Sequence, residues 1–167
     1  MLTRIATVVA ALCMIFISSG TGRAQDLATA IIGVWKVVSI ETKEVASGKV
    51  TRPLGDQLTG TFVFTRGGRF SGMVFRADRK APEGANATEP ERVALFNSLV
   101  AYNGSYRIDG DKLVMTIESS HIQSWNGTNR VLTIGINGTR LTGRSAPLKA
   151  ASTGLEVIAE NVWERLE

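Results

Sequence analysis

The stretch "LATAIIGVWKVVSIE" (Leu27–Glu41) decides the fold, because a tryptophan follows a glycine at the start of an apolar strand. A short apolar lead-in comes first, and the segment from Val34 to Glu41 then has the β-branched content that is typical of a buried strand. Gly33-Val34-Trp35 forms the junction between the two. Trp35 either begins an ordinary core or seals the closed end of a barrel.

The segment ahead of Leu27 has the order of a secretory signal peptide. Arg4 gives a positive start, Ile5–Ile17 is an apolar run, and the residues up to Ala24 are mostly small and polar. Gly22 and Ala24 occupy the −3 and −1 positions before Gln25. The apolar run is shorter than the roughly 20 residues that a membrane span needs. We therefore predict a leader at 1–24, its removal, and export of one domain, 25–167, to the periplasm or the extracellular space.

Removal of this leader changes the composition of the mature chain. Cys13 is the only cysteine, and Arg4 and Arg23 are two of the 19 Lys and Arg residues, so the formal charge falls from +4 to +2. The remaining basic residues are interspersed with acidic ones, which argues against a nucleic-acid partner. About 143 residues are enough for one domain with a sizeable core.

The mature chain is expected to be an antiparallel all-β protein. Glycine-containing turns at Gly67-Gly68, Asp109-Gly110 and Asn137-Gly138 separate apolar segments, and such dipeptides supply the positive φ that tight hairpins need. The segment "GKVTRPLGDQ" is predicted to be a loop. About eight strands follow one another as a meander, and the last lies near Leu155–Arg165.

A single helix is predicted within this meander. Thr88-Glu-Pro-Glu91 has the pattern of a capping box with proline in the first turn. Val93, Phe96 and Val100 then recur at helical spacing, together with Leu95 and Leu99. An amphipathic helix beside a barrel must bury its apolar stripe, so we expect this helix to cover one opening.

The hairpin geometry predicts which side chains point inward. A three-residue turn Arg66-Gly67-Gly68 with a left-handed Gly68 places the phenylalanines on one face, whereas a two-residue Gly-Gly turn divides them. We favour the first. The predicted interior, ligand-binding set is Phe62, Phe64, Phe70, Tyr102, Tyr106, Met115, Ile117 and Leu132.

Four sequence blocks resemble the lipocalin-like domain family of bacteria and fungi, a group of calycin-type β-barrels. They are Gly33-Val34-Trp35, "AYNGSYRIDGDKL" (Ala101–Leu113), "WNGT" (Trp125–Thr128) and "VWER" (Val162–Arg165). The resemblance implies an up-and-down barrel of about eight strands with an internal cavity. It also implies a structural seal in which Arg165, on the last strand, covers Trp35 on the first; an indole under a guanidinium gains cation–π energy.

The chain departs from the pattern of this family at the interior. Many members carry histidine where this chain has Met115 and Thr116, and arginine near Leu132 and Thr133. Because Met115 and Leu132 are expected to face inward, the resemblance implies a more apolar interior here than in those relatives, and chemistry built on that histidine is in doubt.

Catalytic and metal-binding patterns were sought in the mature chain. His121 is its one histidine, so a structural zinc site is excluded, and no cofactor is expected. Ser119 and Ser120 precede His121 on an extended segment, where neighbouring side chains diverge, so a polar loop residue is the favoured interpretation of His121. Glu118 is expected to point outward. No catalytic residue is assigned.

Three functional hypotheses remain open. The leading one is an exported module that binds a small apolar molecule in the barrel, with Tyr102 and Tyr106 giving selectivity. The second is an isomerase or cyclase that confines an apolar substrate, and the third is an envelope protein with a solid core and no ligand. Neither a nucleic-acid partner nor a membrane span of the mature protein is expected.

Overall fold

The computed structural model describes residues 21–150 and 153–167. Most of the predicted leader therefore lies outside the described residues, and its last four residues begin helix α1. The elements, in chain order, are α1 (Thr21–Ala30), β1 (Gly33–Glu44), β2 (Val50–Thr51), β3 (Leu58–Phe64), β4 (Arg69–Arg76), α2 (Glu89–Asn97), β5 (Leu99–Asp109), β6 (Lys112–Ser120), the 3-10 turn η1 (Gln123–Trp125), β7 (Asn129–Asn137), β8 (Arg140–Ser145), β9 (Leu148–Lys149) and β10 (Glu156–Arg165).

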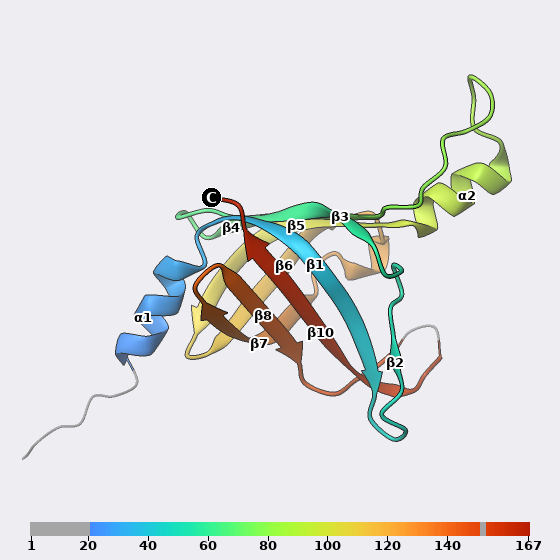
Figure 1. Ribbon diagram of the computed structural model, residues 1–167. Helices are drawn as coiled ribbons and strands as arrows, with labels where there is room; N and C mark the ends of the chain where they lie inside the picture. Colours follow the sequence, from blue (N-terminus) through green and yellow to red (C-terminus); the bar gives the residue numbers. More distant parts are fainter. Residues whose placement is uncertain (1–20, 151–152) are drawn as a thin grey trace, which may run out of the picture.

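Eight antiparallel strands form a closed barrel, as the sequence predicts (Figure 1). Successive strands from β1 to β10 pair with their neighbours, and the short strands β2 and β9 flank the sheet. The first and last long strands close the circle: Trp35 pairs with Arg165, and the pairing continues to Glu44 and Val157. Val38 is an extra residue in this ladder, and the resulting bulge bends β1 at the closure.

The two ends of the barrel differ in their connections. At one end lie three tight hairpins, between β3 and β4, β5 and β6, and β7 and β8. At the other end lie four longer segments, 45–57, 77–98, 121–128 and 146–155. We call these the hairpin end and the loop end. Binding groups gather on long connections more often than on tight turns, so the loop end is the natural place for a site.

The predicted three-residue turn between β3 and β4 is confirmed. Gly68 has φ of 73°, its N–H donates to the carbonyl of Thr65, and Phe64 pairs directly with Phe70. This register puts Phe62, Phe64 and Phe70 on the same inward face. The alternative two-residue turn, which divides these rings between two faces, is wrong.

A helix lies against one end of the barrel, but it is α1 and not the helix predicted for that place (Figure 1). Leu27 of α1 packs against the core, and Ile31, directly after α1, is fully buried. Helix α2 begins at the predicted cap, Thr88, with its capping box formed. However, α2 contains no buried residue and extends away from the barrel beyond the loop end.

The position of α2 has a physical cause in its connection. The long polar segment 77–88 precedes it, and β5 follows almost at once, so the helix continues the line of β5 instead of folding back (Figure 1). Phe96 remains half-exposed, and its ring meets His121 at 5.2 Å between centroids. Phe96 therefore contacts the loop-end rim and not the barrel interior. Leu99 and Val100, which were predicted to belong to the same helical stripe, lie instead in β5, where Val100 packs against the core.

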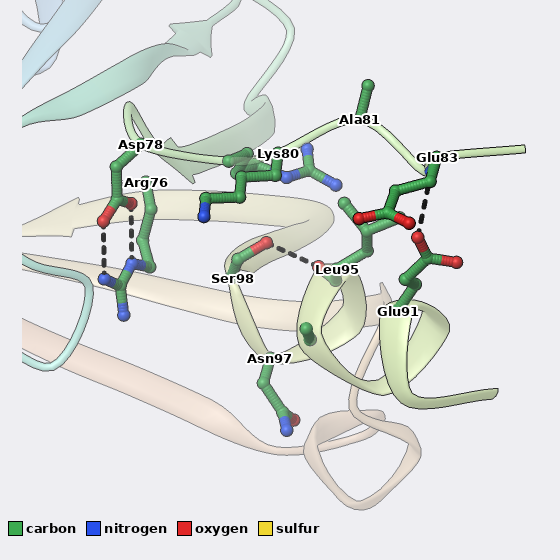
Figure 2. A pocket seen from close by; sticks show the side chains of 11 residues that line it. Arg76, Asp78, Lys80, Ala81, Glu83, Glu91, Leu95, Asn97 and Ser98 are labelled. Atoms are coloured by element: carbon green, nitrogen blue, oxygen red, sulfur yellow. Dashed lines mark hydrogen bonds and ion pairs between the residues drawn. The ribbon is translucent and has the colours of Figure 1, made fainter. Parts of the chain in front are cut away.

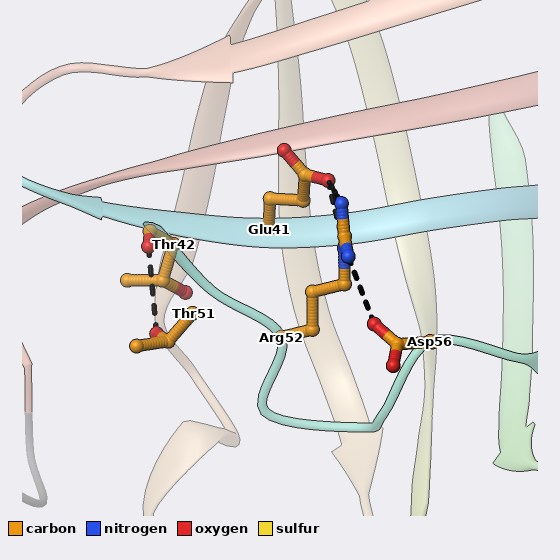
Figure 3. A network of polar contacts seen from close by, with 5 residues as sticks. All are labelled: Glu41, Thr42, Thr51, Arg52 and Asp56. Atoms are coloured by element: carbon orange, nitrogen blue, oxygen red, sulfur yellow. Dashed lines mark hydrogen bonds and ion pairs between the residues drawn. The ribbon is translucent and has the colours of Figure 1, made fainter. Parts of the chain in front are cut away.

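The segment between β1 and β3 is held to the barrel by an ionic network (Figure 3). Arg52 donates to Glu41 through Nε at 2.9 Å and through Nη2 at 2.7 Å, and to Asp56 through Nη1 at 2.8 Å. Leu54, between these contacts, is buried within the core cluster. The predicted loop thus contributes one apolar side chain to the loop end of the core.

Candidate functional site in the barrel interior

All eight residues of the predicted interior set point into the barrel. Six are buried in the main core cluster, and Tyr102 and Tyr106 are partly buried and packed against it. Within this set, Phe64 and Ile117 are fully buried, whereas Tyr106 is only partly buried and its ring meets Phe64 edge-on. The hydroxyl of Tyr106 donates to the Thr65 carbonyl at 2.8 Å, in the turn at the hairpin end.

Aromatic rings form a continuous chain across the barrel toward the loop end. Phe62 meets Tyr102 edge-on at 5.6 Å and Trp163 at 5.7 Å, and Phe70 meets Tyr102 at 5.7 Å. Tyr102 then meets Trp125, in the 121–128 connection, at 6.0 Å. These perpendicular contacts are the favoured geometry between aromatic quadrupoles.

Two glycines make room for these rings. A Cβ built on Gly72 would lie 2.4 Å from the ring of Phe62, and one on Gly143 would lie 3.0 Å from the ring of Trp163. Both positions face the interior, because Gly72 pairs with Phe62 and with Tyr102. A larger residue at Gly72 would displace the ring that connects the two halves of the aromatic chain.

Arg130 is an interior residue that the sequence analysis did not identify. It begins β7 two residues before Leu132 and pairs across the ladder with Met115, whose side chain is fully buried. Since alternate residues of a strand share a face, Arg130 points inward with Leu132. The sequence contained the signal for this. Residue 130 lies on the same face of the strand as Leu132, so the prediction that Leu132 points inward applies to residue 130 as well.

The guanidinium of Arg130 lies among aromatic rings. Its Cζ is 4.0 Å from the centroid of Trp125 and 5.8 Å from that of Tyr102. Its Nε is buried and has no hydrogen-bond partner among the described residues. A cation over an indole is stabilised by roughly 2 kcal/mol when desolvated, but an orphaned buried donor costs about 1–3 kcal/mol.

Two further polar atoms of this region are also buried without a partner among the described residues. They are the indole N–H of Trp163 and Oδ1 of Asn126, which lies next to Trp125. Native proteins leave few such atoms orphaned. Three such atoms in or beside the apolar interior indicate hydrogen-bonding capacity that the described residues do not use.

Burial raises the pKa of Tyr102 to about 12, against a smaller opposing effect of the Arg130 charge. The phenol is therefore fully protonated at neutral pH and can donate a hydrogen bond. Asn161 also faces this region, because it pairs with Ile40 on one side and with Gly143 on the other, and both of these point inward. Together, Tyr102, Trp125, Arg130, Asn161 and Trp163 define what we call the loop-end site.

The hairpin end has a different chemistry, centred on Trp35 and Arg165. The Arg165 Cζ lies 4.1 Å from the centroid of the fully buried Trp35 ring. The guanidinium donates to the carbonyl of Ile32 at 2.9 Å and to that of Ala30, and the Trp35 indole donates to Ile31 at 2.7 Å. These donors satisfy carbonyls at the end of α1, which a helix leaves without partners.

The residues considered for catalysis have structural partners. Glu118 points outward and pairs with Arg69 through two bonds of 2.6 and 2.7 Å, and this pairing lowers the pKa of Glu118. Nδ1 of His121 lies 3.1 Å from the N–H of Ala101, while Oγ of Ser120 accepts from the N–H of Ile122. Neither serine is bonded to the imidazole, so the geometry gives no nucleophile–base pair here.

One surface pocket lies beyond the loop end, and another lies at the hairpin end, where the inward-facing Ile134 and Ile136 form part of its wall. The first, of about 560 Å³, lies between α2 and the segment before it, and its Arg76–Asp78 and Glu83–Glu91 contacts are internal to the wall (Figure 2). The other, of about 530 Å³, lies between α1 and β7.

Within residues 21–150 and 153–167, no group of three or more metal-ligating side chains occurs, and no helix is long and apolar enough to cross a bilayer.

The sequence matches one family model and is similar to two solved structures. A family model described as a lipocalin-like domain matches residues 32–166. A solved lipocalin-like protein from Bacteroides uniformis ATCC 8492 is similar at 12% identity, covering 81% of this chain and 98% of that one, with a TM-score of 0.44. An uncharacterized protein from Bacteroides eggerthii DSM 20697 is similar at 14% identity, covering 80% and 98%, with a TM-score of 0.41. No curated protein matches the sequence.

Proposed function

Because this chain belongs to the lipocalin-like domain family, we propose that it binds a small, largely apolar molecule in the interior of its barrel. The observation that carries the proposal is the loop-end site, where a chain of aromatic rings ends at polar atoms without partners among the described residues. Apolar walls with a few convergent polar groups are the usual composition of a small-molecule site.

The uneven burial of the interior supports the same proposal. Toward the hairpin end, Trp35, Phe64 and Leu113 are at most 1% exposed and form a closely packed floor, although Ile108 and Ile136 beside the turns are only partly buried. Toward the loop end, the inward-facing Ile40, Tyr102 and Asn161 keep partial exposure, while Val74 and Ile117 are fully buried. We therefore expect the ligand to sit above the floor and beneath the long connections.

The proposal includes the cellular setting. The positively charged start, the apolar run and the small residues before Gln25 support removal of residues 1–24 and export to the periplasm or the extracellular space. N-terminal sequencing of the protein from fractionated cells tests this. Intact protein in the cytoplasmic fraction would contradict it.

Binding is tested with a neutral apolar fluorophore, N-phenyl-1-naphthylamine, and a matched pair of variants. The wild-type protein should enhance its fluorescence saturably with one site per chain. Asn161→Trp places a large ring in the loop-end site and should weaken binding about tenfold or more, whereas Glu164→Trp, which is exposed on the same strand, should not.

A companion measurement is mass spectrometry of molecules extracted from the purified protein. A co-purifying apolar compound that is lost in Asn161→Trp supports the proposal. No saturable fluorescence and no co-purifying compound would argue for the solid-core alternative.

A further inference from the structure

The charge on Arg130 points to the chemical class of the ligand. Building on the function proposed above, we propose that the ligand is a monoanion, an alkyl or aryl carboxylate, whose acidic group pairs with Arg130 and whose apolar body lies along Phe62, Phe70 and Trp163. The inference stands on four observations about the surroundings of the guanidinium.

First, Arg130 has no carboxylate partner among the described residues, unlike five other arginines. The ion pairs among the described residues join Arg52, Arg69, Arg76, Arg107 and Arg144 to carboxylates, and in each pair both side chains are at least a quarter exposed. None of these pairs includes Arg130. Arg165, which is also partly buried without a carboxylate, donates to backbone carbonyls, whereas Nε of Arg130 has no partner among the described residues. Because a guanidinium is charged at every physiological pH, Arg130 keeps donor capacity for an anion.

Second, the aromatic contacts of the guanidinium leave its Nε donor without a hydrogen bond. Cζ of Arg130 lies over the ring of Trp125, 4.0 Å from the ring centroid. The five N–H donors of arginine point outward in the plane of the guanidinium, in a fork that matches the two oxygens of a carboxylate. Nε, one of the donors of this fork, is buried and has no partner among the described residues.

Third, the other polar groups of the loop-end region are neutral. Tyr102 is protonated at neutral pH, the buried indole N–H of Trp163 has no acceptor among the described residues, and Oδ1 of Asn126, beside Trp125, is an acceptor without a donor there. One positive charge among neutral groups suits a ligand with a single negative charge. A dianionic phosphate would keep one charge uncompensated in an aromatic interior, which is costly.

Fourth, the rest of the site is apolar. Phe62 and Phe70 flank Tyr102, Trp163 lies beyond Phe62, and Leu54 belongs to the same core cluster. Phe62, Phe70 and Leu54 offer no side-chain hydrogen bonds to the hydroxyls of a sugar or the amides of a peptide, but they bury hydrocarbon well. The two halves of the site thus specify an amphipathic molecule with one acidic end.

The test uses decanoate, decan-1-ol and decylamine, which share a chain and differ in the end group. Each displaces N-phenyl-1-naphthylamine from the full-length mature protein at pH 7.5. Wild type should bind decanoate about tenfold or more tightly than decanol, because charge-assisted hydrogen bonds contribute about 1.5–3 kcal/mol, and it should bind decylamine weakest.

The variants assign that preference to one residue. Arg130→Met should bind decanoate and decanol alike, with decanol affinity changed by less than about threefold, whereas Arg130→Lys, which keeps the charge, should retain part of the preference. Arg144→Met, on the outer surface, is the matched control and should behave as wild type. Circular dichroism checks that each variant is folded.

The outcomes separate this inference from the proposed function. If the fluorophore binds but decanoate is no better than decanol in wild type, or if Arg130→Met keeps the preference, the carboxylate assignment is wrong and apolar binding stands. If the fluorophore itself does not bind, both fail. If Arg130→Met does not fold, the wild-type comparison of the three probes and the Arg130→Lys variant still decide.

Discussion

Trp35 and Arg165 show what a single pair of residues contributes to this barrel. The two side chains join the first strand to the last, and their polar atoms bond to the three backbone carbonyls of residues 30–32. The pair therefore fixes three elements at one point. Trp35 lies in the floor of the barrel, at the end opposite the connections that surround the loop-end site.

The first prediction follows from this geometry. Trp35→Ala should destabilise the protein by about 3–5 kcal/mol, because a fully buried indole is lost. In a double-mutant cycle with Arg165→Ala, the two losses should be less than additive by about 1 kcal/mol, since each change already breaks the stacking contact. Urea denaturation measures both quantities, and apolar-probe affinity should be unchanged where the variants remain folded.

The control for this cycle is Glu164→Ala, an exposed neighbour of Arg165 on the same strand. It should show no coupling to Trp35. Strict additivity of Trp35→Ala and Arg165→Ala would mean that the two residues act independently and that the stacked pair is not a seal.

The second prediction concerns Tyr102 and alkaline pH. Its folded-state pKa is about 12, above the usual value of 10.0, because burial disfavours the phenolate. The unfolded chain therefore loses this proton first as pH rises, and the stabilisation that is fully present below pH 10 is lost as pH approaches 12. Between pH 9 and 11.5, this difference in ionisation should lower the free energy of unfolding by about 2 kcal/mol.

Tyr102→Phe tests this contribution directly. The free energy of unfolding of the variant, followed by urea titration, should fall less steeply over that pH range than that of wild type. Tyr106→Phe is the comparison, since Tyr106 is the other tyrosine of the chain. Equal slopes for wild type and Tyr102→Phe would show that Tyr102 ionises as readily in the folded protein as in the unfolded chain.

At the scale of elements, the sequence predicted those features that depend on local chemistry. The Gly68 turn, the capping box at Thr88 and the two other tight hairpins all come from short patterns with a defined backbone geometry, and all are present. What the sequence did not predict is where α2 lies. Its stripe specifies an apolar face, but the partner of that face depends on the long connection 77–88, whose path no local pattern encodes.

The segment 45–57 leads to a third prediction, about exchange. Arg52 holds this segment to Glu41 and Asp56, and Leu54 enters the core at the loop end (Figure 3). In Arg52→Met, release of N-phenyl-1-naphthylamine in stopped-flow experiments should be several-fold faster, because the segment is less firmly held. Global stability should change by less than about 1 kcal/mol, as for other exposed ion pairs.

The ion pair between Arg144 and Glu160 provides the control for this experiment, since it lies on the outer surface away from that segment in sequence. Arg144→Met should leave the release rate unchanged. An unchanged rate in Arg52→Met would mean that the segment does not limit ligand exit.

At the scale of the whole molecule, the barrel was predictable and the polarity of its interior was not. Alternation along β6 and β7 correctly placed Met115 and Leu132 inside, and from these apolar residues the interior was expected to be more apolar than in related proteins, with Tyr102 and Tyr106 as its polar groups. Arg130 follows the same alternation but lies at the start of its strand, beside a connection, where an arginine would ordinarily be assigned to solvent. Its contacts with Trp125 and Tyr102 join residues from three separate segments, which only the closed barrel brings together.

The closure between β1 and β10 also determines when this protein can finish folding. The bond from Arg165 to Ile32 joins residues that are 133 positions apart, so the last pairing has the largest loop-closure cost and is available only after Arg165 has been synthesised. A nascent chain that still lacks β10 can pair seven strands of the barrel as an open sheet with two bare edges, but it cannot form the barrel. The interior therefore exists only once β10 has emerged from the ribosome, and any translocation of an unfolded chain takes place before there is a site to fill.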